Sequence, residues 1–117
     1  MERIFKTTLL FDFYGELLTK KQKQVFSLHY QDDLSFTEIS EELEITRQGV
    51  HDQLKRTEKI LLGYEEKLKL VERFLHQHKS LSKIQSIIES MTFQPTEENQ
   101  NGFSEIMELI DDVLEND

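Results

Sequence analysis

Apolar residues recur at helical spacing along most of the chain, and the strict alternation of apolar and polar residues that marks a β-strand is absent. The first segment, residues 2–14, is apolar on nearly every side. Its apolar residues are Ile4, Phe5, Leu9, Leu10, Phe11, Phe13 and Tyr14. A helix of this kind must be buried on several faces, which is difficult in a small monomer, so the segment indicates a partner surface. Gly15 is the expected end of this helix.

Two capping boxes predict the next two helices. In a capping box, a Ser or Thr and a Glu or Gln three residues later bond to each other's backbone N–H groups at the start of a helix. Thr19 with Gln22, and Ser35 with Glu38, have this spacing. The helices that they predict cover residues 20–30 and 36–43.

A tight corner joins the second of these helices to a third. Glu44 and Ile45 form the corner, and Thr46 is expected to cap the helix that follows. Apolar residues on either side of the corner are spaced to face one core, and they are Ile39, Leu43, Ile45, Val50 and Leu54. This layout predicts a helix-turn-helix, with a helical bundle that has a chance corner as the alternative.

A long helix follows the corner. Over residues 54–75, positions 54, 57, 61, 64, 68, 71 and 75 are Leu, Thr, Leu, Tyr, Leu, Val and Leu. This heptad row fits either packing inside the same chain or the seam of a homodimer. The second interpretation joins two copies through this seam and the apolar first helix. Gly63 is expected to bend the long helix or to let another helix approach.

The C-terminal third contains two further helical patterns separated by a polar stretch. Ser80 or Ser82 is expected to cap a helix over 82–91, whose inward residues are Ile84, Ile87, Ile88 and Met91. Residues 103–114 are amphipathic, with one apolar face formed by Phe103, Ile106, Leu109, Ile110, Val113 and Leu114. We therefore predict an all-α protein in three parts. These are a helical body over 1–91 with the helix-turn-helix at 18–62, a linker over 92–102 that contains Pro95, and an acidic amphipathic helix over 103–117.

Composition agrees with a helical fold and excludes several classes of protein. The 117 residues include one Pro and four Gly, so few positions interrupt a helix. Cys is absent, which excludes disulfides and thiolate metal sites and fits a reducing compartment. No segment reaches the ~18 apolar residues of a membrane span, and the N-terminus lacks a signal-peptide cleavage site. We expect a cytoplasmic protein without a membrane partner.

No arrangement of residues indicates catalysis or a cofactor. Gly-rich phosphate loops, nucleophile elbows and paired metal-binding histidines are absent from the sequence. His76 and His78 are two apart on a helix and point to different sides, so we expect them at the surface. His29 lies among apolar residues and is expected to be a packed side chain. The sequence predicts a protein that is not an enzyme, with no catalytic residue, metal site or cofactor.

The formal net charge of −9 belongs to the C-terminal tail. Residues 92–117 hold eight acidic residues and no basic one, whereas residues 1–91 hold all 14 basic residues and 15 acidic ones. A nearly neutral body does not exclude nucleic acid, because a basic face matters more than a basic total. The acidic tail is expected either to regulate access to a basic face by mimicking phosphate or to pack for stability alone.

The helix after the corner carries the candidate DNA-binding residues. Val50 and Leu54 must face the core, so the opposite side of that helix faces solvent. The candidates on that side and at the start of the helix are Arg47, Gln48, His51, Asp52, Lys55, Arg56 and Lys59. In a major groove these side chains would meet base edges and phosphates. Lys20, Lys21 and Lys23 either add phosphate contacts or form a solvated helix end.

The helix-turn-helix resembles region 4 of bacterial sigma factors over the stretch LTKKQKQVFSLHYQDDLSFTEISEELEITRQGVHDQLKRTEKIL. The matching positions are Leu18, Val25, Phe26, Leu28, Tyr30, Glu38, Ile39, Leu43, Ile45, Thr46, Val50, Leu54 and Arg56. With its flanks, the range 1–75 is similar to the YlxM family of small helix-turn-helix proteins of Gram-positive and related bacteria. The resemblance implies a cytoplasmic, all-helical protein with a DNA-binding region. The family's genes typically neighbour those of the signal recognition particle, which implies a role in that pathway.

Several residues depart from the sigma pattern. Sigma region 4 often carries Arg at the positions of His51 and Gln53 and Gly at the position of Glu44. Asp52 places a negative charge in the middle of the candidate reading face, where a cytosine amino group is its base partner. We therefore hold two hypotheses. The first is a homodimeric DNA-binding regulator linked to the signal recognition particle. The second is an accessory factor that contacts the particle's protein or RNA without reading DNA.

Overall fold

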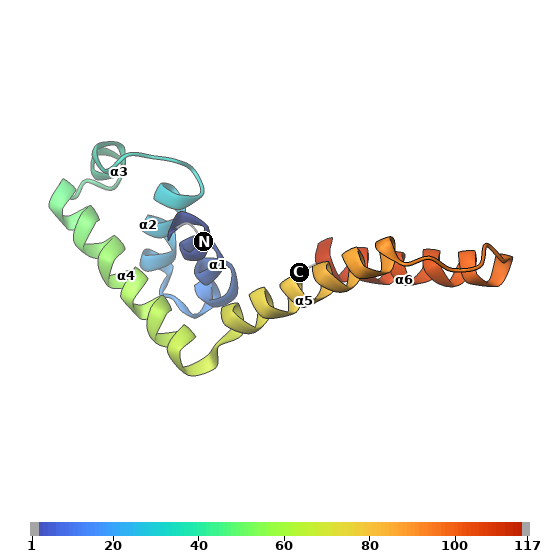
Figure 1. Cartoon of the computed structure of the whole chain (residues 1–117). Coiled ribbons are helices and arrows are strands. Elements are labelled where there is room, and N and C mark those ends of the chain that lie inside the picture. The colour runs from blue at the N-terminus through green and yellow to red at the C-terminus, as the bar shows by residue number, and fades with distance from the viewer. Residues whose placement is uncertain (1–2, 116–117) are drawn as a thin grey trace. The chain divides into compact units, whose positions relative to one another are not determined.

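The computed structural model describes residues 3–115, which form helices joined by short turns, without a β-strand in that range (Figure 1). The predicted all-α class is therefore confirmed. The elements are α1 (Arg3–Tyr14), the 3₁₀ turn η1 (Gly15–Leu17), α2 (Lys20–Tyr30), α3 (Phe36–Leu43), α4 (Arg47–Leu68), α5 (Leu70–Ser90) and α6 (Glu97–Glu115). They divide into two compact units, Met1–Val71 and Glu72–Asp117, and the boundary predicted at residue 92 lies inside the second.

Both predicted capping boxes are present, and each begins a helix at the predicted residue. The Thr19 hydroxyl accepts the Gln22 backbone N–H at 3.2 Å, and the Gln22 side-chain oxygen accepts the Thr19 N–H at 3.0 Å. Ser35 and Glu38 repeat this arrangement at 3.1 Å and 3.0 Å. Because each box satisfies orphan N–H groups with residues three apart, the starts of α2 and α3 are determined locally.

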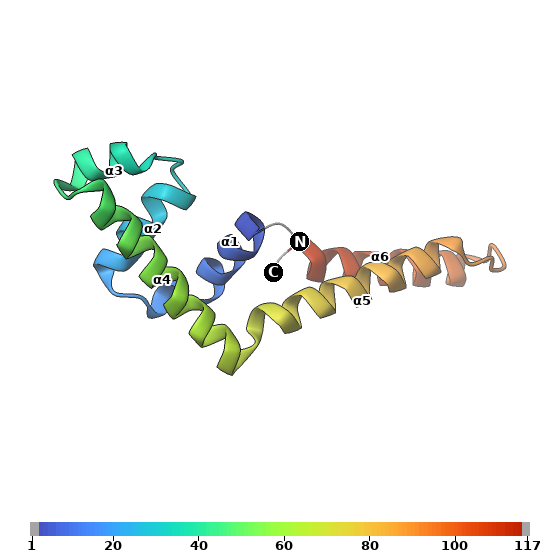
Figure 2. The ribbon, with the colours of Figure 1, turned by 60° about the vertical axis from the view of Figure 1, so that its left-hand side comes forward.

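α3 and α4 meet at a tight corner (Figure 2). The residue at this corner, Glu44, is in the left-handed conformation. Glu44 has φ 56° and ψ 42°, a conformation that Gly adopts without the steric penalty of a Cβ. Ile39 and Val50, on either side of the corner, are fully buried. Thr46 caps α4 by accepting the Gly49 N–H at 2.9 Å. The predicted helix-turn-helix is therefore present in α3 and α4.

The buried side of α4 packs within its own unit. Leu54, Thr57 and Leu61 are at most 5% exposed, and α4 contacts α1, α2 and α3. In the same unit the rings of Phe11 and Phe26 stack with their centroids 4.8 Å apart. The first half of the heptad row is thus covered by the chain itself. The expectation of a homodimer seam over 54–75 is wrong for these positions.

The long helix predicted through residue 75 is interrupted at Lys69. α4 ends at Leu68, Lys69 adopts a left-handed conformation with φ 55°, and α5 begins at Leu70. Gly63, where a bend or the close approach of another helix was expected, lies within the continuous α4. A Cβ placed on Gly63 would have nothing within 4 Å, so no helix approaches closely there.

The first helix is buried over only part of its surface. Leu10 and Tyr14 are each 1% exposed, whereas Ile4 and Phe5 are 68% and 52% exposed. The helix ends before Gly15, as predicted. Its exposed side leaves apolar area on the surface of the first unit, although burial on several faces was expected.

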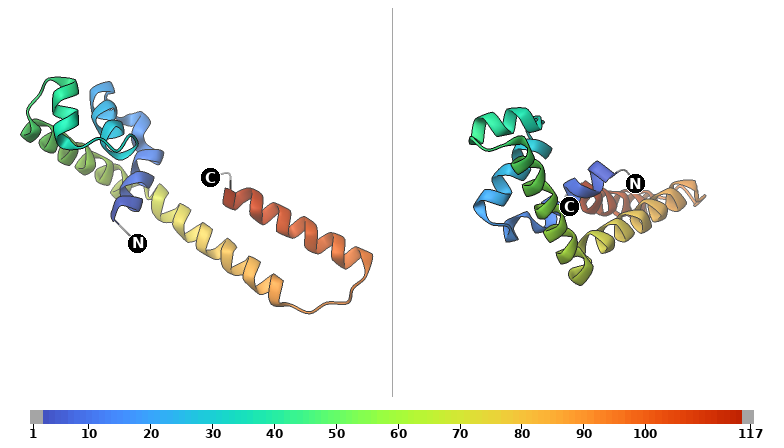
Figure 3. Two further views of the ribbon diagram at one scale, coloured as in Figure 1. Left: turned by 90° about the horizontal axis from the view of Figure 1, so that it is seen from above. Right: turned by 90° about the vertical axis from the view of Figure 1, so that its left-hand side faces the viewer.

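The second unit is a hairpin in which α5 and α6 run antiparallel, side by side (Figure 3). The Gln85 side-chain amide donates to the Asp111 carboxylate at 2.8 Å, and the rings of Phe93 and Phe103 lie 5.6 Å apart. The acidic helix is therefore packed on α5 within this unit. Three apolar residues that were expected to face inward are exposed instead: Ile84, Ile87 and Met91.

Helix boundaries in the second unit differ from the predicted ones. Ser80 and Ser82 lie inside the continuous α5, so neither begins a helix. α6 begins at Glu97, earlier than the predicted residue 103. Its cap is Thr96, whose hydroxyl accepts a backbone N–H of the first turn at 3.1 Å. The segment between the helices is therefore only 91–96.

Candidate nucleic-acid interface

One face of α4 is buried and the opposite face carries the candidate residues. Val50, Leu54, Thr57 and Leu61 form the buried face, because residues three and four apart share one side of a helix. Of the seven candidates, His51 is half-buried. The other six are exposed: Arg47, Gln48, Asp52, Lys55, Arg56 and Lys59. The structure thus brings all seven onto one helix with access to solvent.

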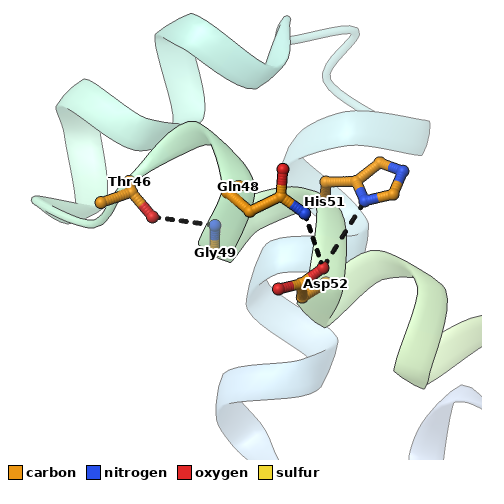
Figure 4. A network of polar contacts seen from close by, with 5 residues as sticks. All are labelled: Thr46, Gln48, Gly49, His51 and Asp52. Carbon is orange, nitrogen blue, oxygen red and sulfur yellow. Dashed lines mark hydrogen bonds and ion pairs between the residues drawn. The ribbon is translucent and has the colours of Figure 1, made fainter.

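The first turns of α4 hold a small polar network (Figure 4). The Gln48 side-chain amide donates to Asp52 Oδ1 at 3.0 Å, and His51 Nδ1 lies 3.6 Å from the same oxygen. The Asp52 carboxylate therefore has two polar neighbours on its own helix. A base contact made by Gln48 would compete with its bond to Asp52.

A hollow of about 580 Å³ lies where the start of α3 meets the start of α4. Its lining residues are Phe36, Thr37, Arg47, Gln48 and His51. Arg47 Nη1 donates to the Thr37 hydroxyl at 3.5 Å, and the rings of Phe36 and His51 lie 5.9 Å apart. The sequence did not single out Thr37, because only the tertiary corner places it beside Arg47.

A second hollow, of about 260 Å³, lies between the start of α2 and the middle of α4. Its lining residues are Thr19, Lys21, Gln22, Gln53, Arg56 and Thr57. Lys21 and Arg56 supply two cations from different helices. The buried Oε1 of Gln53 accepts no hydrogen bond from any residue that the structure describes. Lys23 does not line this hollow. Its ammonium group instead forms an ion pair with Glu16 at 2.6 Å.

Carboxylates lie close to this basic face. Glu38, Glu41, Glu42 and Glu44 are all exposed on α3 or at its end. The Ser35 backbone N–H, and then its hydroxyl, hold the pKa of Glu38 below its ordinary value by hydrogen bonding to the charged form. These charges oppose phosphate binding, so the interface as a whole is of mixed charge.

The described residues also bear on three other features considered from the sequence, namely a metal site, a membrane span and the histidines. Among residues 3–115, no group of three or more His, Asp or Glu is placed to hold a metal ion. The helices of that range include none long and apolar enough to cross a membrane. His29 is a packed side chain, as expected, with Nδ1 2.9 Å from the Leu34 carbonyl oxygen. His76 is exposed, and His78 is half-buried with its ring 4.4 Å from that of Phe74.

Comparison of the sequence with known proteins identifies its family. The family described as "Putative helix-turn-helix protein, YlxM / p13 like" matches residues 1–110. UPF0122 proteins of Bacillus cereus (strain AH187) and Bacillus anthracis (strain A0248) are each 46% identical to this chain over 88 residues. These matches cover 75% of the chain and 80% of each relative. A UPF0122 protein of Bacillus thuringiensis subsp. konkukian (strain 97-27) is similar to the same extent.

Proposed function

The chain belongs to the YlxM/p13-like family of helix-turn-helix proteins, and on that premise we propose that it is a DNA-binding regulatory protein. It acts in the signal recognition particle pathway or on the operon of that particle, in line with the gene neighbourhood typical of the family. α4 is the helix that enters the major groove, since a helix of ~10–12 Å diameter fits a groove of ~12 Å width.

The exposed cations of α4 are the observation that carries this proposal. Lys55, Arg56 and Lys59 are exposed on the helix whose opposite face, including Leu54, is buried in the core. Long cationic side chains bind phosphate oxygens and displace counterions, which makes the affinity dependent on salt. Lys21 lines the hollow beside Arg56, so α2 supports phosphate contacts from a second element.

The residues at the start of α4 make the base contacts. In helix-turn-helix proteins the N-terminal residues of the recognition helix lie over base edges. Gln48 and Asp52 are exposed at that end, and they are joined by a hydrogen bond of 3.0 Å. A carboxylate accepts from the cytosine amino group and repels acceptor edges, so Asp52 restricts the bases that α4 tolerates.

Salt titration of DNA binding tests the proposal. Each phosphate contact that is lost lowers the slope of log K against log salt by roughly 1. We expect Lys55→Ala with Arg56→Ala to reduce both affinity and slope. Lys6→Ala with Lys79→Ala removes the same charge from exposed sites on α1 and α5, away from α4, and serves as the matched control. Equal losses in the two double variants, or none in either, would show that α4 is not the reader.

A second candidate is an accessory factor of the signal recognition particle that reads no DNA. It is favoured by the carboxylates on α3 and by Asp52 in the middle of the basic face. Pull-down from lysate with and without nuclease separates the two functions. Recovery of the particle's protein or RNA, at an affinity that Lys55→Ala with Arg56→Ala leaves unchanged, would support the accessory role over DNA reading.

A further inference from the structure

The hairpin of α5 and α6 leaves one apolar row exposed on each helix. The rows are Ile84, Ile87 and Met91 on α5, and Ile106, Leu109 and Val113 on α6. Each of these residues is between 42% and 62% exposed. Within the described part of this unit only Ile110 is buried, so the hairpin has almost no core of its own. Helical units this small are stabilised by a partner that covers their apolar side.

The two exposed rows lie on the same side of the hairpin. Successive residues of a helix are about 100° apart around its axis. On each helix the exposed row is therefore roughly a quarter-turn from the row that faces the other helix, and the direction of this rotation is the same on α5 and α6. The facing rows are Leu81, Gln85 and Ile88 on α5, and Phe103, Met107, Ile110 and Leu114 on α6. Antiparallel helices that face each other are related by a local twofold axis perpendicular to both. Equal rotations therefore bring both exposed rows to one side.

The register of the hairpin sets these residues at matching heights. The bond between Gln85 and Asp111 and the ring contact between Phe93 and Phe103 align the helices. Each step of one residue forward along α5 is therefore level with a step of one residue backward along α6. The layers that result are Ile84 with Val113, Ile87 with Leu109, and Met91 with Ile106. The opposite side of the hairpin is polar and carries Ser82, Ser86, Glu89, Ser104 and Glu108.

We propose that a second copy of this chain covers the apolar side, so that two hairpins form an antiparallel four-helix bundle. Charges on the outer edges select the arrangement. The outer edge of α5 carries Lys79 and Lys83, and that of α6 carries Glu105 and Asp112, of which Asp112 is level with Lys83 in this register. A twofold axis parallel to the helices places α5 against α6 of the second copy and brings opposite charges together. Pairing like helices would bring like charges together.

The whole side of the hairpin that carries the apolar rows, including the polar residues beyond the ends of those rows, also has a size that fits a second copy. α6 has 19 residues, so it is about 28 Å long. Two adjacent helices of about 10 Å diameter then present a projected face of roughly 560 Å². A standard interface buries roughly 800 Å² of accessible surface per partner. Accessible surface follows the contours of the side chains and exceeds the projected area, so the two values are of the same order of magnitude. Such a bundle forms without nucleic acid and does not depend on the proposed function.

Sedimentation equilibrium of the full chain tests the bundle. We expect the wild type to be a dimer at micromolar concentration and Leu109→Glu to weaken dimerisation by roughly tenfold or more, because the carboxylate would be buried. Ser86→Glu on the polar side of α5 and Phe5→Glu on α1 add the same charge elsewhere and should leave the dimer unchanged. A wild type that is monomeric at high micromolar concentration, or dissociation by Phe5→Glu instead of Leu109→Glu, overturns the proposal.

The absence of Cys from the chain permits a second test that does not rely on disruption. Ile87→Cys and Leu109→Cys proteins are prepared separately, mixed and oxidised. Because these residues are level on facing helices, we expect a disulfide between the two variants. Disulfides formed only within each variant would show like helices paired and overturn the arrangement. The absence of any intermolecular disulfide overturns the dimer interface itself.

Discussion

The Tyr14 hydroxyl donates a hydrogen bond of 2.6 Å to the Glu65 carboxylate across 51 positions of sequence. The same two side chains accept the first amides of α5, from Leu70 to Tyr14 at 3.1 Å and from Val71 to Glu65 at 3.0 Å. Amides at the start of a helix lack partners within the helix. Tyr14 and Glu65 therefore act as a cap supplied by α1 and α4, at the point where the chain turns through Lys69.

Removal of the Tyr14 hydroxyl tests this cap. Tyr14→Phe should lower the free energy of unfolding by about 1–3 kcal/mol, since it leaves the Leu70 amide and the Glu65 carboxylate short of a partner. Urea denaturation followed by circular dichroism measures the loss. Tyr64→Phe is the control, because it removes the same atom from the ring that lies 5.9 Å from Tyr14 and keeps both bonds. Equal losses in the two variants would contradict the role given to Tyr14.

A glycine inside α4 offers a stabilising substitution. Gly63→Ala should raise the free energy of unfolding by about 0.5–1 kcal/mol, because Ala loses less backbone entropy in a helix and the added Cβ meets nothing within 4 Å. Gly15→Ala is the contrasting variant, since its Cβ would lie 3.2 Å from the Phe11 ring. Thermal melts compare the two. A destabilised Gly63→Ala protein would mean that another helix does approach at this position.

The second capping box should make the stability of α3 depend on pH. Hydrogen bonds from Ser35 lower the pKa of Glu38 in the folded chain. A lowered pKa contributes stability that is present above the ordinary carboxyl pKa of about 4.3 and is lost as pH falls through the lowered value. Glu38→Gln keeps a neutral cap, so its stability relative to wild type should improve as the pH is reduced. An unchanging difference across that range would exclude the charged cap.

The packing of α6 on α5 predicts the outcome of removing the tail. Deletion of residues 95–117 uncovers the inward row of α5, so the melting temperature should fall and the affinity for DNA should not increase. Melts and DNA titrations at fixed salt measure both quantities. Tighter DNA binding after the deletion, with a gain that shrinks as salt rises, would instead show that the acidic helix masks the basic face.

Features that depend on neighbouring residues were determined by the sequence alone. The pairs Thr19 with Gln22 and Ser35 with Glu38 located the starts of two helices, because a cap needs only residues three apart. The buried positions Val50 and Leu54 likewise located the exposed face of α4 and its candidate residues, since helical periodicity relates one face to the other. Thr96 carried the same kind of signal for α6, beside Pro95, and was missed.

Features that depend on distant residues were decided only by the tertiary structure. The heptad row over 54–75 is compatible with packing within one chain and with packing between two chains. The choice depends on where α1 and α2 lie, and in the structure they contact α4, where Leu54, Thr57 and Leu61 are buried. Lys69 carries no local signal for a break, because its left-handed backbone is offset by the hydrogen bonds that the next two amides donate to Tyr14 and Glu65. Thr37 beside Arg47, and Lys21 beside Arg56, are brought together for the same physical reason. Contacts between elements depend on how whole helices pack, and spacing along a single helix does not encode that.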